Sequence, residues 1–96
     1  MLIGVLIVEY ALHGMESLKG KRRIANSIKQ KTRNQFNVAI AETGSEDCMT
    51  RLRLSVVSVS NDERHLQSRL TKCLSHMQAC TPEEMVYSDI EIMGIE

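Results

Sequence analysis

Aromatic residues are scarce in this 96-residue sequence, which has two tyrosines, one phenylalanine and no tryptophan. Proteins that recognise RNA on the face of a β-sheet stack the bases on aromatic side chains. Tyr10 and Phe36 alternate in step with the apolar residues around them, so both should point toward a core. Only Tyr87 would then be left for the surface, and we do not expect a base-stacking platform.

Cysteines are also few, and their number is odd. Cys48, Cys73 and Cys80 include no Cys-x-x-Cys pair, so neither a disulfide framework nor a zinc site is expected. Cys73 and Cys80 are seven residues apart and can share one face of a helix, where cysteine packs as a small hydrophobic residue. We expect free thiols, no metal or other cofactor, and a location in the reducing cytoplasm.

Long hydrophobic runs are absent from the sequence. No apolar segment approaches the roughly 18 residues that a membrane-spanning helix needs. The opening segment MLIGVLIVEYAL is apolar, but it has no basic residues before it and no cleavage site made of small residues. We therefore expect a buried strand there rather than a secretory signal, and no association with a membrane.

Residues typical of catalysis are missing or scattered. The turn segments HGMES and TGSED have one glycine each, so neither forms a glycine-rich phosphate loop. Glu9, His13 and Ser17 fall near one end of the predicted sheet, but their order and the fold supply no oxyanion site. His65 and His76 are spread along a later helix. We expect no enzymatic activity and no small-molecule substrate.

Apolar periodicity predicts strands and helices in the first half of the chain. Residues 2–12 are rich in Ile, Val and Leu and predict a strand that is apolar on both faces. From Ser17, a suitable helix N-cap, apolar residues recur at helical spacing until residues 34–35. Residues 36–42 and 49–60 then alternate as two half-buried strands, which we expect to form a hairpin.

The second half of the chain predicts another helix and a last strand. The segment SNDE fits a capping box, in which Ser60 is the N-cap and Glu63 reaches back to it. The apolar stripe of the helix that follows consists of Leu66, Leu70, Cys73, Leu74 and Met77. Residues 85–96 alternate again, and the pattern points Val86, Ile90 and Ile92 toward the core.

The resulting order is β-α-β-β-α-β in a single domain of residues 1–96. Two helices can cover only one face of a four-stranded sheet, and crossover connections are right-handed. These rules select an α+β fold of the ferredoxin-like, split βαβ type. We expect a four-stranded antiparallel sheet with both helices on one face.

Positive charge is concentrated in residues 17–33, which hold seven Lys and Arg residues and no acid in a chain of zero net charge. On a helical wheel the apolar residues form one arc and most of the cations form another. Lys21 falls on the apolar arc, so we expect its ammonium to extend toward the helix end. The polar arc also contains Gln30, and Lys29 lies at its edge. The predicted binding residues, here called the basic stripe, are Lys19, Arg22, Arg23, Asn26, Lys29 and Arg33.

The basic stripe has more than one explanation at this point. Lys and Arg in a row can neutralise the phosphates of a nucleic acid. Cations this close to a helix N-terminus oppose the macrodipole, which favours a functional reason for them. The stripe can equally bind another anionic partner, or be a solvated surface that is balanced by acids elsewhere. The candidate acids are Glu83, Glu84, Asp89, Glu91 and Glu96.

The face of the predicted sheet without helices is too apolar to remain in water. Contiguous apolar patches beyond a few hundred Å² usually mark interfaces, so we expect a homodimer that packs sheet on sheet. The alternative is that loops and chain ends cover this face. The predicted interface residues are Ile3, Val5, Ile7, Ala39, Ala41, Val57 and Val59.

Two blocks of sequence, SLKGKRR at 17–23 and RNQFNV at 33–38, resemble the YlxP-like family of small uncharacterised bacterial proteins. The segments GVLIVEY and VSVSND are similar to that family as well, and the resemblance spans the whole chain. It implies a ferredoxin-like fold and no established activity. Genes of this family often lie among those for translation and ribosome maturation, which implies a link to RNA. Gly20 departs from the family, which commonly has an acidic residue there.

Together these observations predict a non-catalytic domain that binds structured RNA, with ribosomal RNA as a candidate, through the basic stripe. A protein-interaction module that dimerises through the open sheet face is the alternative, and the two functions are compatible.

Overall fold

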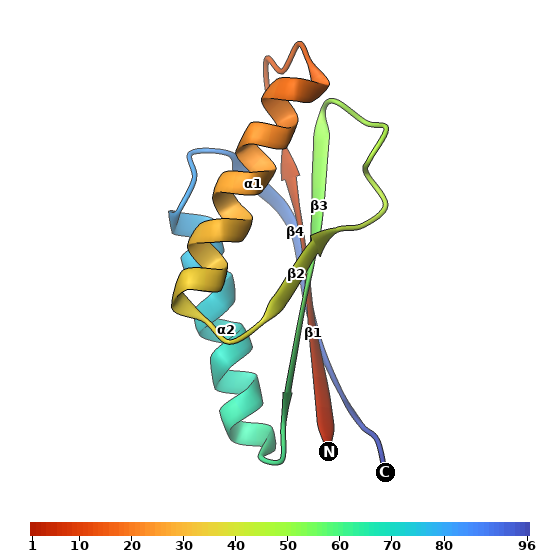
Figure 1. Cartoon of the computed structure of the whole chain (residues 1–96), viewed down its shortest axis with the longest axis vertical. Coiled ribbons are helices and arrows are strands. Elements are labelled where there is room, and N and C mark those ends of the chain that lie inside the picture. Colours follow the sequence, from red (N-terminus) through yellow and green to blue (C-terminus); the bar gives the residue numbers. More distant parts are fainter.

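The computed structural model describes all 96 residues and has the predicted order of elements (Figure 1). The elements are β1 (Leu2–Ala11), α1 (Leu18–Gln35), β2 (Ala39–Glu42), β3 (Arg51–Ser60), α2 (Glu63–Ala79) and β4 (Glu84–Gly94). The sheet order is β2-β3-β1-β4, and every neighbouring pair is antiparallel. Both helices lie on one face of the sheet. The α+β, ferredoxin-like prediction is therefore confirmed.

The core lies between the two helices and the sheet. Alternate residues of the two central strands are fully buried, including Leu6 and Val8 in β1 and Leu54 in β3. Leu66, Leu70, Cys73 and Met77 of α2 are fully buried against them, as their spacing predicts, and Leu74 is half-buried. Tyr10 also points inward, and its hydroxyl donates a hydrogen bond to the Met77 carbonyl at 2.8 Å.

The last strand contains a β-bulge, which the sequence pattern did not reveal. Pairing with β1 shifts register here, so that Glu9 faces Tyr87 but Tyr10 faces Met85. A bulge inserts one residue and reverses the alternation beyond it. Val86 is 43% exposed, so its predicted place in the core is wrong, and Met85 packs there instead. The reversal affects the N-terminal end of β4, whereas Ile90 and Ile92 on the C-terminal side of the bulge face the core as expected.

One of the two predicted helix caps is correct. The Ser17 hydroxyl accepts a hydrogen bond from the Gly20 amide at 3.0 Å at the start of α1. The predicted capping box at Ser60 is wrong, because Asp62 caps α2 and accepts from the His65 amide at 3.0 Å. That hydrogen bond lowers the pKa of the Asp62 carboxyl. Ser60 ends β3 and accepts from the Asp62 amide.

The predicted hairpin is formed by β2 and β3, from Ala39 opposite Val57 to Glu42 opposite Leu54. The first strand is shorter than the predicted segment 36–42. Because α1 continues to Gln35, the next three residues form the connection rather than the strand. Phe36 and Val38 still pack against the core from this connection.

Candidate functional site

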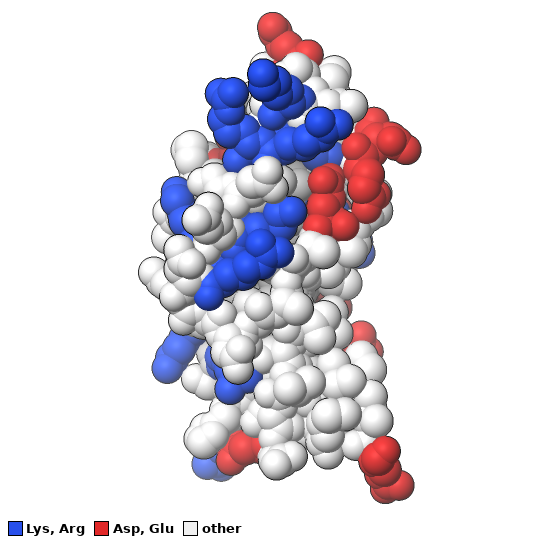
Figure 2. All heavy atoms as spheres, in the orientation of Figure 1, with Lys and Arg blue, Asp and Glu red and all other residues white.

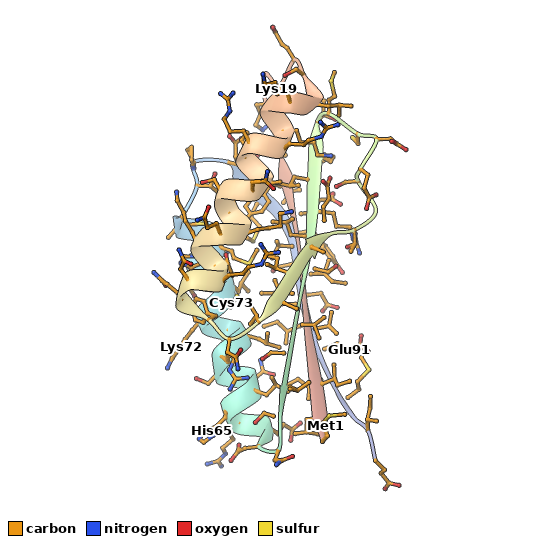
Figure 3. The ribbon with its side chains drawn as sticks, in the orientation of Figure 1. Met1, Lys19, His65, Lys72, Cys73 and Glu91 are labelled. Atoms are coloured by element: carbon orange, nitrogen blue, oxygen red, sulfur yellow. The ribbon has the colours of Figure 1, made fainter.

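Lys and Arg side chains gather along α1 (Figure 2). Lys19, Arg22, Arg23 and Asn26 are exposed, and none of the three cations has a carboxylate within ion-pair distance. Figure 3 marks Lys19 in the first turn of the helix. These four side chains of the basic stripe are free to contact a ligand.

The other two members of the basic stripe face β2. Arg33 donates a hydrogen bond from Nη2 to the carbonyl oxygen of Ile40 at 2.9 Å and so ties α1 to this edge strand. Lys29 is half-buried, and its positive charge is among the factors that lower the pKa of Glu42. The predicted stripe therefore divides into four free positions and two that face β2, of which Arg33 also bonds to it.

Lys21 does not extend toward the helix end, and that prediction is wrong. Its side chain is 3% exposed, and its ammonium forms an ion pair with Glu42 Oε2 at 2.8 Å. The same ammonium donates hydrogen bonds to the carbonyl oxygens of Ser45 and Cys48. The three donors of Lys21 therefore meet three oxygens, which satisfies a charge that would otherwise be costly to bury.

The Lys21 contacts fix the β2–β3 loop, residues 43–50, against α1. Ser45 donates to Glu42 Oε2 at 2.7 Å and accepts from the Arg53 amide at 2.9 Å. Burial alone would raise the pKa of Glu42, but the hydrogen bonds from Lys21 and Ser45 and the charge of Lys21 outweigh it and lower that pKa. The loop carries two exposed acids, Glu46 and Asp47, and Figure 2 shows acidic atoms beside the basic ones. Negative charge thus borders the basic stripe on its β2 side.

The acids that could balance the charge of the basic stripe make no ion pair with it. Asp89 and Glu91 project from the sheet face opposite the helices, where Figure 3 marks Glu91. Glu84 contacts His13 at 2.9 Å. Glu83 lies near Arg23 at a shallow groove but makes no ion pair with it. Direct pairing therefore does not neutralise the stripe.

Glu9, His13 and Ser17 do not come together as a triad. Glu9 pairs with Arg53 on β3 at 3.7 Å, His13 contacts Glu84, and the Ser17 hydroxyl caps α1. Each side chain is held by a different partner.

A groove runs between the C-terminal ends of α1 and α2 and is lined by Lys31 and His76. Lys31 donates to the carbonyl oxygen of Cys80 at 3.2 Å, close to the end of α2. The His76 ring packs edge-on against Phe36 at 5.5 Å, and its buried Nε2 has no hydrogen-bond partner. Burial, and then the charge of Lys31, lower the pKa of His76.

His76 should make the folded state sensitive to mild acid. Because its pKa is lower in the folded state than the ordinary 6.5, the unfolded chain binds a proton first. Stability should be complete above pH 6.5 and fall as the pH drops through the lowered folded value. Urea denaturation at pH 7 and at pH 5 should show that the free energy of unfolding falls less for His76→Phe than for the parent.

The control for this prediction is His65→Phe on the same helix, where the ring is 79% exposed. Between pH 7 and pH 5, His65→Phe should lose as much free energy of unfolding as the parent does. An identical pH dependence for His76→Phe and the parent would contradict a role for His76.

All seven residues of the predicted oligomer interface lie on the face of the sheet without helices. Ile3, Val5 and Ile7 are half-buried between their neighbours in the sheet. Val57 and Val59 are 38% and 53% exposed, and the two alanines, Ala39 and Ala41, are exposed as well. Loops and chain ends therefore leave this face open. Neither α1 nor α2 has the length and hydrophobicity of a membrane-spanning segment.

Comparisons with known proteins agree with the resemblance drawn from the sequence. The model of a family described as a protein of unknown function, DUF503, matches residues 3–90. The uncharacterised protein YlxP of Bacillus subtilis (strain 168) is 28% identical over 78 residues, which are 81% of this chain and 85% of that protein.

Solved structures show a likeness of fold alone. Protein Atu4242 from Agrobacterium tumefaciens superposes with a TM-score of 0.52 at 8% identity, over 98% of this chain and 92% of that one. The C-terminal domain LarC2 of a cyclometallase has a TM-score of 0.45 at 13% identity, over 97% of this chain and 56% of that one, too weak to support an argument. On the family match, the chain belongs to the DUF503 family, and the resemblance to YlxP-like proteins is confirmed.

Proposed function

We propose that this protein is a non-catalytic, cytoplasmic RNA-binding domain that contacts the phosphates of structured RNA, with ribosomal RNA as the first candidate, through the basic stripe of α1. One observation carries the proposal. The exposed cations of α1 make no ion pair, although the chain has as many acids as bases and could have paired them.

The position of these cations on the helix supports the same function. Lys19, Arg22 and Arg23 lie in the first two turns, and the first turn contains no acid. Cations there are unfavourable for the helix, because its N-terminus already carries partial positive charge. The same partial charge adds to the field that an approaching phosphate meets. The stripe from Lys19 to Arg33 is about 20 Å long at 1.5 Å per residue, which is enough for several phosphates.

The mode of contact follows from where the aromatic rings lie. Tyr10 is fully buried and Phe36 packs against the core, so neither can stack on a base. Tyr87 is exposed on the open face, where the Arg53 guanidinium lies 5.8 Å from its ring centroid. A single ring is no stacking platform. Recognition should therefore act through phosphates, 2′-hydroxyls and the shape of a folded RNA.

Salt dependence is the direct test of phosphate contact. If α1 contacts about four phosphates, the slope of log affinity against log salt should be near −3 to −4. Affinity for an RNA hairpin should fall by roughly two decades between 50 and 200 mM salt. The double variant Arg22→Gln/Arg23→Gln should flatten the slope by about two units, as fluorescence anisotropy can measure.

The matched control is Arg64→Gln/Lys72→Gln, which removes the same charge from exposed positions of α2. It should leave the slope near that of the parent. If both double variants flatten the slope equally, binding reflects overall charge and the proposal fails. The variant avoids Arg33, because its bond to Ile40 would add a structural effect.

A further inference from the structure

On the open face of the sheet, the size and the charge of the side chains change from one edge to the other. Strand register places residues in rows across the sheet, and one row reads Ala39, Val57, Val5 and Glu91 from β2 to β4. The next row reads Ala41, Ser55, Ile7 and Asp89. One edge thus presents methyl groups, the other presents carboxylates, and the two central strands are largely apolar between them.

The charged groups near this face are arranged in complementary positions. Arg53 on β3 and Glu9 on β1 occupy the same row, toward the C-terminal end of β1. Arg33 reaches the β2 edge from α1, at the Ile40 carbonyl. The carboxylates of Asp89 and Glu91 therefore lie on the β4 edge of the sheet, and the Arg33 guanidinium lies at the β2 edge.

We propose that a second copy of this chain covers the open face, with the two-fold axis of the dimer parallel to the strands. This rotation keeps each row at its level and lays β2 of one copy over β4 of the other, and β3 over β1. Val57 then meets Val5 of the other copy, and the Arg53–Glu9 ion pair of one copy meets that of the other. Glu91 lies over the small Ala39, close to Arg33. Each contact occurs twice, as a two-fold interface requires.

The other face-to-face arrangement is disfavoured by charge. A two-fold axis perpendicular to the strands would lay β4 of one copy on β4 of the other. Glu91 of one copy would then face Glu91 of the other. Juxtaposed like charges oppose association. The acids on β4 therefore select the parallel axis.

The size of the face is consistent with this dimer only if the sheets overlap fully. Three strands of 10, 10 and 11 residues and the four-residue β2, about 4.8 Å apart, span roughly 550 Å² in projection. A standard interface buries about 800 Å² of accessible surface on each partner. Projecting side chains give a face more accessible surface than its flat projection, so full overlap can approach this value. Aligned sheets cross at about −30°, so the strands of the two copies lie over one another near the middle of the face.

The dimer leaves α1 on the outside of each sheet, so this inference does not depend on RNA binding. The two proposals also differ in their response to salt. Apolar contact should persist at the salt concentrations that abolish phosphate contact.

Light scattering on a sizing column should give twice the 10.9 kDa mass of one chain at micromolar concentration. Val57→Asp should halve that mass. The control is Met49→Asp, at a residue of matched exposure in the β2–β3 loop, 39% against 38%, and it should remain dimeric. If Val57→Asp fails to fold by circular dichroism, Val59→Asp at a more exposed position should give the monomer. A monomeric parent, or folded dimeric aspartate variants, would overturn the proposal.

Chemical crosslinking tests the direction of the axis. Stacked sheets lie about 10 Å apart, too far for a disulfide, so a short bismaleimide is the suitable probe. Ala39→Cys/Glu91→Cys should give a covalent dimer in high yield, above the background of the unsubstituted chain with its three thiols. Either single variant should stay near that background. If Glu91→Cys alone crosslinks as well as the pair, the axis is perpendicular to the strands and this arrangement is wrong.

Discussion

Lys21→Met should lower the free energy of unfolding by about 3 kcal/mol, the low end for breaking a buried ion pair. The variant removes the cation that pairs with Glu42 and the ammonium that donates to the carbonyls of Ser45 and Cys48. Glu42 then keeps only its hydrogen bond from the Ser45 hydroxyl. For a chain of this size the melting temperature should fall by about 15 °C. The loop at residues 43–50 should also become easier to cleave with protease, because the contact that fixes it is gone. Urea denaturation and limited proteolysis measure these two effects.

Two further variants separate the ion pair from a general effect of charge on α1. Lys29→Met removes a half-buried cation from the same helix and should change stability by about 0.5 kcal/mol or less. Glu42→Leu added to Lys21→Met should restore part of the loss, because no charge is then buried alone. If Lys21→Met is as stable as the parent, the buried ammonium is not a structural anchor.

Gly4→Ala should destabilise the protein by about 1–3 kcal/mol through overpacking. A Cβ at Gly4 would lie 2.5 Å from Leu70 Cδ1 and 3.0 Å from Leu66 Cγ, because α2 packs directly on β1 at this point. The sign of the stability change is informative, because replacing glycine by alanine inside a strand normally stabilises a protein where there is free space for the methyl group. Thermal or urea denaturation distinguishes the two outcomes.

Gly94→Ala is the control for this substitution, because its Cβ would meet nothing closer than Leu2 Cδ2 at 3.8 Å. It should be neutral or slightly stabilising. Combining Gly4→Ala with Leu70→Ala should cost less than the sum of the single changes, since the methyl group would enter the space that Leu70 leaves. Strict additivity would argue against contact at this position.

The fold follows from the sequence wherever one residue pattern determines one face. The stripe from Leu66 to Met77 and the alternation in β1 are local signals, and both are correct in the structure. Val86 was placed wrongly because a bulge depends on pairing with a distant strand. The cap of α2 was placed two residues too early for a related reason, since Ser60 remains paired in β3.

The basic stripe could be outlined from the helical wheel, but its contacts could not. Exposure of Lys19, Arg22 and Arg23 depends only on the period of α1. The partners of Lys21 and Arg33 lie on β2 and its loop, whose position is set by tertiary packing. A lysine in the middle of an apolar arc was the one available sign of a buried ion pair.

The departure at Gly20 also has a structural reason. A Cβ there would lie 2.9 Å from the Met15 sulfur and 3.3 Å from the Ser17 hydroxyl oxygen. Met15 is half-buried over the first turn of α1 and packs against the core. An acidic side chain at this position would require Met15 to move.

The RNA-binding surface is tested most directly by backbone amide chemical shifts during titration with an RNA hairpin at low salt. We expect the shifts to change along α1, from Lys19 to Arg33, and in the groove beside Arg23, while those of Ile3, Val5 and Val57 on the open face stay constant. If only the open face is perturbed, or if nothing is perturbed at a stoichiometric amount of RNA, α1 is not the RNA-binding surface.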